Sequence, residues 1–325
     1  MLTRRETLGL MAAGAVTAAV PTATVPGRAR AQSMPKIVVG MSGWTGFAPI
    51  TLAEKAGLFK KHGLDVDTKF IAQKDRHLAF AAGDIQAIAT VVNTQISYVA
   101  AGIDLTQVLM LDISKGGDGV AVRNGIDSLA ALKGKTIACD GAGSAPYFMM
   151  TWMLKKNGMT MKDVKLATLG PKEAANAFVA GQYDAAASYE PYLSVIRDDP
   201  KSGKILATTI DYPCIVDALS FAPDFIAKNK AAVAAFVAGW HDALDMIKAQ
   251  PDESYKIMGA RVNQTPEQFK ASAQFIQWQD KAANKAYFAK ELMPFMEIAS
   301  EIQIETGIIR SKPDLKRLMD ASFAI

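Results

Sequence analysis

The sequence predicts an α/β fold with two lobes, in which mixed and mainly parallel sheets are flanked by helices. Short apolar stretches alternate with amphipathic helical stretches up to Lys228, as they do in α/β proteins. Gly63, Gly83 and Gly102 each stand directly after an expected helix, where a C-cap glycine belongs. The 294 residues that follow an expected 31-residue leader exceed one ordinary domain and suit two lobes.

The expected elements follow from this alternation. Strands are expected at residues 36–41, 65–71, 87–92, 108–113, 119–122, 135–140, 165–169, 185–188, 204–209 and 216–221. Helices are expected at residues 49–62, 77–82, 94–101, 144–156, 172–180, 231–248, 266–278, 293–306 and 313–322. The chain should cross between lobes near Gly119 and again at 212–217, as at two hinges. Lobe 1 then takes residues 35–118 and 216–325, and lobe 2 takes residues 119–215.

Residues 1–31 have the pattern of a signal peptide. Arg4 and Arg5 precede an apolar run at residues 8–20, and Ala29-Arg30-Ala31 offers a cleavage site. We expect twin-arginine (Tat) export, with the Sec route as the alternative. The apolar run is shorter than the roughly 20 residues that a membrane span needs, and no cysteine follows the cleavage site to carry a lipid. The sequence therefore predicts a soluble periplasmic protein with no membrane anchor.

Charge and motif content exclude several classes of function. Without the leader the chain has 32 basic and 31 acidic residues, so no basic surface is expected for nucleic acid or anionic membranes. The turn at 141–146 matches neither a nucleophile elbow nor a dinucleotide fingerprint. The three histidines show no metal-ligand spacing, and we expect no metal, no cofactor and no catalytic residue. Cys139 and Cys214 are either two small buried residues, which we favour, or a disulfide.

Two segments resemble the taurine/nitrate/sulfonate branch of periplasmic solute-binding proteins. The first is the aromatic-and-glycine turn at 43–49, followed by Ala53-Glu54 and the run Gly57-Leu58-Phe59 to Gly63-Leu64-Asp65-Val66. The second is the segment 188–192. The resemblance implies a type II periplasmic binding protein fold that closes on a small ligand by hinge bending. It also implies a monomer whose partners are an ABC permease and its ATPase.

Several candidate ligand-binding residues fall in turns. Trp44, with Thr45 and Phe47, lies in the first turn, where an aromatic ring can form a wall of a cleft or pack on the helix behind it. Gly143 and Ser144 precede an expected helix, whose N-terminus can hold an anion or can simply be capped by the serine. We favour the cleft wall for Trp44. The resemblance implies ligand binding at the second turn, where the N-cap interpretation of Ser144 stays equally open.

Further candidates lie at strand ends and at the first crossing. Asn93 either caps a helix or reaches the cleft. Ser114 belongs to a glycine-rich segment that suits a hinge, a close backbone approach or a solvated loop. Tyr189 and Glu190 lie in the segment 188–192, where the acid either accepts a ligand N–H or favours the helix dipole.

Asp217 is the strongest candidate. It interrupts an otherwise apolar strand at the second crossing, where an acid is costly unless it is paired or solvated. In the taurine-binding branch an Asp at the matching place holds the ammonium of the ligand. A structural hydrogen bond to hinge backbone is the alternative.

The resemblance leaves other functions open. The family resembles pyrimidine synthases of thiamine biosynthesis, although their Cys-rich motif and histidine chemistry are missing here. A ligand-binding subunit of a sensor is a third possibility. We expect a transport protein without enzymatic activity, whose ligand is taurine-like, a sulfonate, nitrate or another small nitrogen-bearing molecule.

Overall fold

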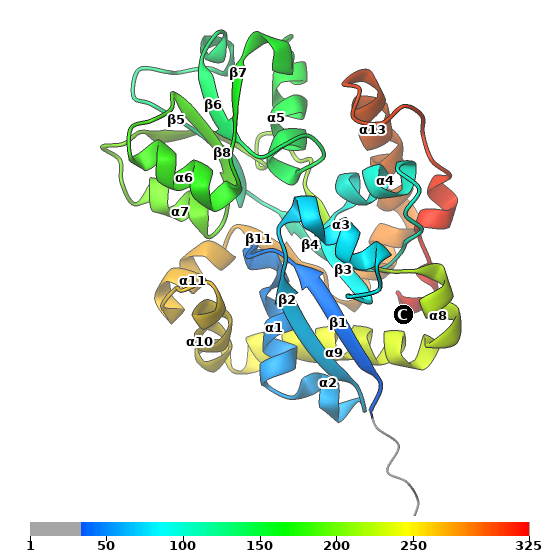
Figure 1. Cartoon of the computed structure of the whole chain (residues 1–325). Helices are drawn as coiled ribbons and strands as arrows, with labels where there is room; N and C mark the ends of the chain where they lie inside the picture. Colours follow the sequence, from blue (N-terminus) through cyan, green and yellow to red (C-terminus); the bar gives the residue numbers. More distant parts are fainter. Residues whose placement is uncertain (1–33, 325) are drawn as a thin grey trace, which may run out of the picture. The chain divides into compact units, whose positions relative to one another are not determined.

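The first sheet of the computed structural model, which describes residues 34–324, has six strands in the order β11-β4-β10-β3-β1-β2 (Figure 1). The expected leader lies outside the described residues. The strands are β1 (Lys36–Met41), β2 (Asp65–Phe70), β3 (Ala87–Val91), β4 (Thr106–Ser114), β10 (Val216–Phe221) and β11 (Ile276–Trp278). β1 pairs in parallel with β2 and β3, whereas β10 runs antiparallel between β3 and β4.

The second sheet has five strands in the order β7-β6-β8-β5-β9. They are β5 (Asp118–Val122), β6 (Thr136–Cys139), β7 (Lys165–Thr168), β8 (Ala185–Tyr189) and β9 (Lys204–Thr208). The sheets are mixed, as expected, but parallel pairing does not predominate, since four pairings in the described residues are parallel and five are antiparallel. The reason is that β5 and β10, which follow the two crossings, enter each sheet against the direction of their neighbours.

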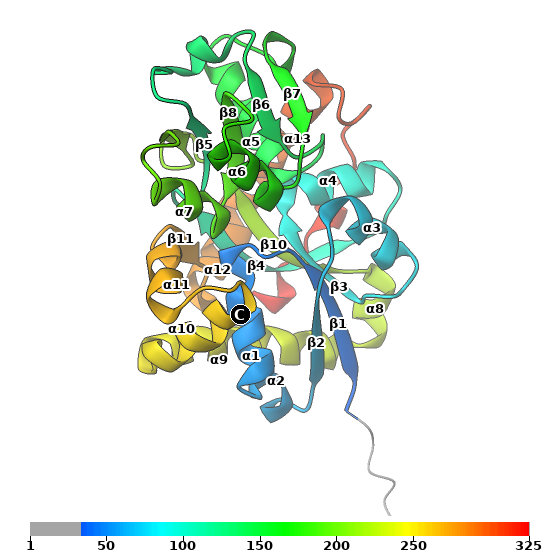
Figure 2. The same cartoon turned by 60° about the vertical axis from the view of Figure 1, so that its left-hand side comes forward.

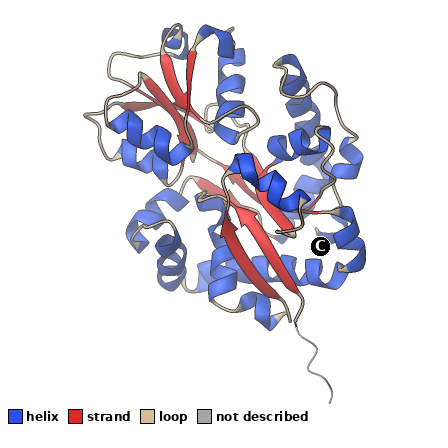
Figure 3. Ribbon diagram, viewed as in Figure 1, coloured by secondary structure: helices blue, strands red, loops and turns tan. Residues whose placement is uncertain are grey.

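Helices flank both sheets (Figures 2 and 3). One face of the first sheet packs against α1 (Ala48–Lys55), α2 (Leu58–Lys61), α9 (Lys230–Ala249), α10 (Pro251–Arg261) and α11 (Pro266–Ala273). The other face packs against α3 (Gln73–Ala81), α4 (Val92–Ala100) and α13 (Leu292–Glu305). The second sheet lies between α5 (Ala145–Lys156) and the pair α6 (Pro171–Val179) and α7 (Tyr192–Arg197). The helices α8 (Pro223–Lys228) and α12 (Lys281–Ala286), several 3-10 turns and one π-helical segment complete the described chain.

Apolar packing joins the two sheets. Alternate β1 side chains, Ile37 and Val39 among them, pack with Trp240 of α9 in a core that belongs mainly to the first sheet. A second core cluster combines Val91 of the first sheet with Phe148 of α5, so its apolar surface is shared. Burial of such side chains stabilises the fold by about 25 cal/mol per Å² of apolar surface removed from water.

The elements differ from the expected ones at several places, and the expected ranges do not include α7, α8, α10 and α12. Gly57, with φ of 73°, divides the expected helix 49–62 into α1 and α2. The expected helix 266–278 ends at Ala273, and Ile276–Trp278 is instead an edge strand paired with β4. The expected C-terminal helix is two short 3-10 turns. The two crossings lie between β4 and β5 and between β9 and β10, and the proposed division into lobes stays a prediction.

Candidate functional site

A small cavity lies between the two sheets, and both contribute to its lining. The lining residues are Ser42, Trp44, Phe47, Gln73, Thr90, Val91, Asp118, Ala145, Tyr189, Ile215 and Asp217. Most of them stand at the ends of β1, β3 and β8 or at the start of α5, β5 and β10. The centre of a water molecule can reach about 20 Å³ of this space, which is room for about one water. A larger solute therefore requires the surrounding elements to move apart.

Trp44 is held in place from both sheets. Its indole Nε1 donates a hydrogen bond to Asp112 Oδ1 at 2.9 Å, and its ring meets the ring of Tyr189 edge to face at 5.6 Å. Two glycines make room for the ring. A side chain at Gly46 would collide with Trp44 Nε1 and the Asp112 carboxyl, and a Cβ at Gly117 would lie 2.6 Å from Trp44 Cη2.

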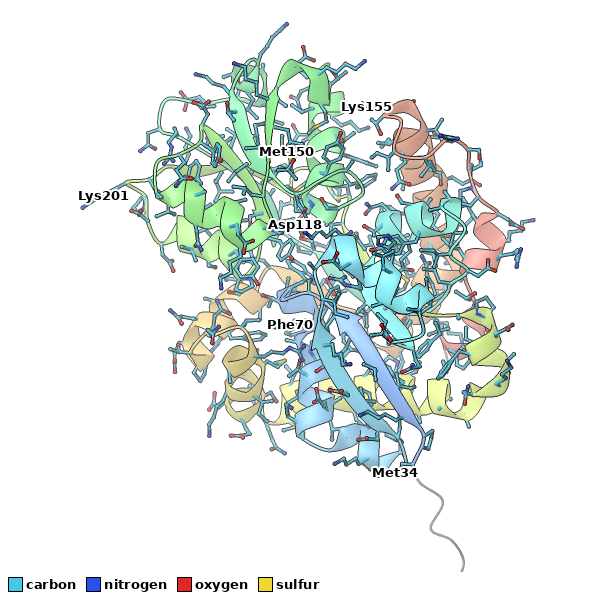
Figure 4. The ribbon with its side chains drawn as sticks, viewed as in Figure 1. Met34, Phe70, Asp118, Met150, Lys155 and Lys201 are labelled. Atoms are coloured by element: carbon cyan, nitrogen blue, oxygen red, sulfur yellow. The ribbon has the colours of Figure 1, made fainter. Side chains whose placement is uncertain are left out.

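Three aspartates converge on the cavity from β4, β5 and β10. All three are buried, and none of Asp112, Asp118 and Asp217 is more than 1% exposed to solvent. Figure 4 shows Asp118 between the two sheets. Among the described residues, Asp112 Oδ2, Asp118 Oδ2 and both carboxyl oxygens of Asp217 have no hydrogen-bond partner. Buried carboxyl oxygens are normally satisfied, so these acceptors indicate a place for a donor, in addition to the hydrogen bond that Asp112 and Asp217 make with each other when one of them is protonated.

The pKa values of these acids show how costly their charges are. Burial raises the pKa of Asp112 to about 8, with the bond from Trp44 opposing the increase and the charge of Asp118 adding to it. Burial also raises the pKa of Asp118 to about 7, and the charge of Glu190 adds to that increase. Desolvation penalises the charged form of a carboxyl, which is the dominant cause in both cases.

Asp217 is affected most strongly. Burial, followed by the charges of Asp112 and Asp118, holds its pKa well above the ordinary range, while the charge of Arg76 acts in the opposite direction. Arg76 is itself 1% exposed. Each of its three side-chain nitrogens donates to a backbone carbonyl, of Ile71 or Ala89, at 2.9–3.2 Å. Arg76 therefore lowers the cost of the acids from a distance without filling the cavity.

The turn before α5 contacts the first sheet through its carbonyl. Gly143 has φ of 88°, and its oxygen accepts hydrogen bonds from Thr94 Oγ1 at 2.6 Å and Gln73 Nε2 at 3.2 Å. Ser144 caps α5, since its Oγ accepts from the Tyr147 N–H at 3.3 Å. Ala145, the first residue of α5, lines the cavity. The alternative reading of Ser144 as an N-cap is thus confirmed, and an anion at this turn stays a prediction.

Besides Gly143 and Ser144, four candidates lie outside the cavity lining, namely Thr45, Asn93, Ser114 and Glu190. Thr45 and Asn93 are buried and have side-chain polar atoms without a partner in the described chain. Ser114 Oγ lies 2.7 Å from Thr209 Oγ1 and accepts from the Asp118 N–H, so it braces the first crossing.

Glu190 is already engaged by protein partners. Its two carboxyl oxygens accept from Arg197 Nε at 3.1 Å and from the Ser194 N–H at 3.0 Å, and its side chain is fully buried. This arrangement favours a structural role for Glu190, while a ligand contact stays a prediction.

Sequence reasoning missed several members of the site. Asp112 interrupts an apolar strand in the same way as Asp217, so the same signal could have found it. Asp118 belongs to the same glycine-rich segment as Ser114 and was not singled out there. Gln73 and Thr90 carry no sequence signal that distinguishes them from surface or core residues. Cys139 and Cys214 are free and buried. Within residues 34–324 no group of His, Cys, Asp or Glu side chains could hold a metal ion, and no helix is both long and apolar enough to cross a bilayer.

The comparison with known proteins covers most of the chain. A protein of Brucella abortus (strain 2308), named for a binding function, is 26% identical over 243 residues, which are 72% of this chain and 73% of the relative. The fold matches that of the alkanesulfonate-binding protein SsuA from Xanthomonas axonopodis pv. citri, bound to MOPS, with a TM-score of 0.74, 18% identity and coverage of 89% and 99%. It also matches the periplasmic nitrate-binding protein NrtA from Synechocystis PCC 6803, with a TM-score of 0.70, 16% identity and coverage of 89% and 87%.

These likenesses confirm the periplasmic binding protein fold that the sequence predicts. The model of the family described as NMT1/THI5 like matches residues 44–254, which include the first turn, all three buried aspartates and both crossings. The chain belongs to the NMT1/THI5-like family.

Proposed function

We propose that the chain is the solute-binding subunit of an ABC importer, which captures a small nitrogen-bearing solute between its two sheets and delivers it to the permease. The observation that carries this proposal is Asp217, a buried acid with two unpartnered oxygens that lines a cavity shared by both sheets. Burying Asp217 without hydrogen-bond donors destabilises the fold, and a bound ligand that supplies those donors would offset the cost. The names of the relatives support a binding role, and export to the periplasm is part of the proposal.

The contacts between the sheets suggest how capture works. Apart from the chain crossings, the two sheets and their helices meet through several polar contacts and apolar packing. The polar contacts include the Thr94 and Gln73 bonds to Gly143, the bond from the Thr45 N–H to the Glu190 carbonyl at 3.3 Å, the Lys155–Glu305 ion pair and the Arg197 guanidinium over the Phe275 ring. Few of these contacts are strong, so hinge bending at the crossings can separate the sheets and admit a solute. A bound solute that contacts both sheets then stabilises the closed form.

Two kinds of ligand are compatible with this site. The first is a zwitterion of the taurine kind, with its acid at the N-terminus of α5 and its nitrogen at Asp217. The second is a cation without an acid. A sensor role shares this binding step and differs only in the partner that reads the closed form.

The proposal is tested with the purified protein. A thermal-shift screen against amines, amino acids, taurine, sulfonates, nitrate and pyrimidines should give a hit, since a ligand at about 100 times its dissociation constant adds about 2.7 kcal/mol to the free energy of unfolding. The hit should then stimulate the ATPase of the cognate permease in proteoliposomes only in the presence of this protein. Conversion of the ligand to a product, instead of release unchanged, would contradict the proposal and favour an enzyme.

A further inference from the structure

We infer that the cavity selects a small organic cation that carries N–H donors and no acidic group, and that it rejects sulfonates and other oxyanions. This inference rests on the proposed function, because it names the chemical class of the captured solute. It differs from the ligands of the two solved relatives, which are named for binding alkanesulfonate and nitrate.

The first argument is the charge of the lining. Of the eleven lining residues two are acids, Asp118 and Asp217, and none of the eleven is a lysine, arginine or histidine. Asp112 lies directly behind them as the register partner of Asp217. A cation in this site favours the charged forms of the acids and is attracted to them, whereas an anion meets no opposite charge in the lining.

The second argument is hydrogen bonding. The oxygens without partners in this part of the described chain are acceptors, and four of them belong to the three aspartates. An ammonium, amidinium or guanidinium group offers several N–H donors and a positive charge to such acceptors. A sulfonate or nitrate carries no N–H donor and would leave the unpartnered oxygens of ionised Asp118 and Asp217 unsatisfied.

The third argument is that the described part of the chain leaves no charged donor free for an acid. The hydroxyl of Ser144 caps its own helix, Pro146 has no N–H, and the carbonyl of Gly143 faces the first sheet. The guanidinium of Arg76 is bonded to backbone carbonyls. In the described chain the donors left for a ligand acid are the Ala145 N–H and the lining hydroxyls of Ser42, Thr90 and Tyr189. All of them are neutral, so none supplies the positive charge that would balance an acid beside Asp118 and Asp217.

Aromatic rings and size narrow the class further. Trp44, Phe47 and Tyr189 provide ring surfaces in the lining, and a cation against an aromatic face gains about 0.5–2 kcal/mol. The space is only about 20 Å³, so even a compact cationic head, such as a primary ammonium or a monosubstituted guanidinium, enters only as the sheets separate, and a bulkier head requires a wider separation.

The charge comparison uses the unmodified protein. Titration calorimetry with ethylammonium and methylguanidinium, and with ethanesulfonate and taurine as size-matched anion and zwitterion, measures the four affinities side by side. We expect both cations to bind at least about tenfold more tightly than ethanesulfonate and taurine. Tighter binding of ethanesulfonate or taurine than of either cation would overturn the inference and leave the binding-protein proposal intact. Failure of any solute of either charge to bind would overturn both.

Variants then locate the cation. Asp217→Asn and Asp118→Asn should each weaken cation binding by more than about tenfold, because each removes a buried charge partner of the ligand. The matched control is Asp224→Asn on α8, whose side chain is 92% exposed and which should bind cations as the original protein does. Unchanged cation affinity in both Asp217→Asn and Asp118→Asn would contradict the inference.

Discussion

Asp112 and Asp217 are direct register partners on the neighbouring strands β4 and β10, and both carboxyl groups are buried. Directly opposed side chains on antiparallel strands lie about 4.5–5.5 Å apart at Cβ, where like charges destabilise a sheet. The fold reduces this cost in two ways. The indole of Trp44 donates to Asp112, and burial raises both pKa values so that protons neutralise the pair.

The opposed pair predicts that stability falls with rising pH. Because the pKa of Asp112 is raised to about 8 in the folded protein, the folded state binds this proton more tightly than the unfolded chain does, whose ordinary value is about 3.9. The contribution to stability is fully present below about pH 4 and is lost as the pH rises through about 8. We expect Asp112→Asn to reduce this loss by more than about 1 kcal/mol, measured by urea unfolding across this range.

The asparagine can keep the acceptor for Trp44, so the comparison isolates the charge. Asp224→Asn, an exposed change on α8, should leave the pH profile as it is. A profile of Asp112→Asn that superimposes on that of the original protein would contradict this account of the acids.

Cation binding should release protons. Three buried acids titrate here, Asp112, Asp118 and Asp217. The charge of Arg76 lowers the pKa of Asp217 and that of the ion-paired Glu190 raises the pKa of Asp118, but burial keeps all three pKa values above the ordinary value. A bound cation favours their charged forms and lowers these pKa values. Affinity for ethylammonium should therefore increase as the pH rises from about 6 to about 8.

Calorimetry in two buffers measures this release directly. The apparent binding enthalpy should differ between phosphate and Tris by the difference in their ionisation enthalpies, multiplied by the number of protons released. Equal enthalpies in the two buffers would show that the acids are already charged before the cation binds.

The sequence predicted the parts of the fold that local patterns encode. The strand 36–41 and the helix N-terminus at Ser144 are confirmed, because alternation of apolar residues and a capping side chain are local signals. The edge strand at Ile276 was read as helix, since its partner β4 lies far away in the sequence. Antiparallel entry of β5 and β10 is also non-local, and local periodicity says nothing about strand direction.

The site was predictable only in part. Trp44 and Asp217 were found because an aromatic ring in a turn and an acid in an apolar strand break local rules. Glu190 was read as a possible ligand contact, although Arg197 holds it, because that pairing depends on how α7 folds back. The convergence of three acids is a tertiary fact, since β4, β5 and β10 come together only through sheet order and the crossings.

Gly46 should tolerate no side chain. A Cβ there would collide with Trp44 Nε1 and with the Asp112 carboxyl, so Gly46→Ala should break the bond between them and cost about 1–3 kcal/mol by overpacking. Urea unfolding measures the cost, and a red shift of tryptophan emission should report a displaced Trp44. Gly141→Ala is the control, because its Cβ would meet Thr168 Cγ2 at an ordinary 3.7 Å.

The buried pair of Glu190 and Arg197 should matter for stability. Arg197→Met leaves the fully buried Glu190 carboxylate without its cation, and breaking such a pair from one side costs about 3–5 kcal/mol. Since the Arg197 side chain is 25% exposed, we expect a value toward the lower end of this range, measured by urea unfolding. Lys228→Met, which removes an exposed pair with Asp224, should change stability by less than about 0.5 kcal/mol. Equal effects of the two substitutions would show that the buried pair is no stronger than a surface pair.

Thr94 should govern the balance between open and closed forms. Its hydroxyl donates to the Gly143 carbonyl at 2.6 Å and lies 2.6 Å from Gln73 Nε2, so Thr94→Val removes the centre of a contact between the two sheets. A hydrogen bond of this kind contributes about 0.5–1.5 kcal/mol. If it forms only in the closed form, its loss should weaken cation binding by about 2- to 10-fold. Calorimetry with ethylammonium measures the loss, and small-angle scattering should show a larger radius of gyration without ligand. Thr168→Val, an exposed position on β7, is the matched control. An unchanged affinity and an unchanged radius for Thr94→Val would mean that apolar packing alone sets the closure, because the hydroxyl would then contribute equally to both forms.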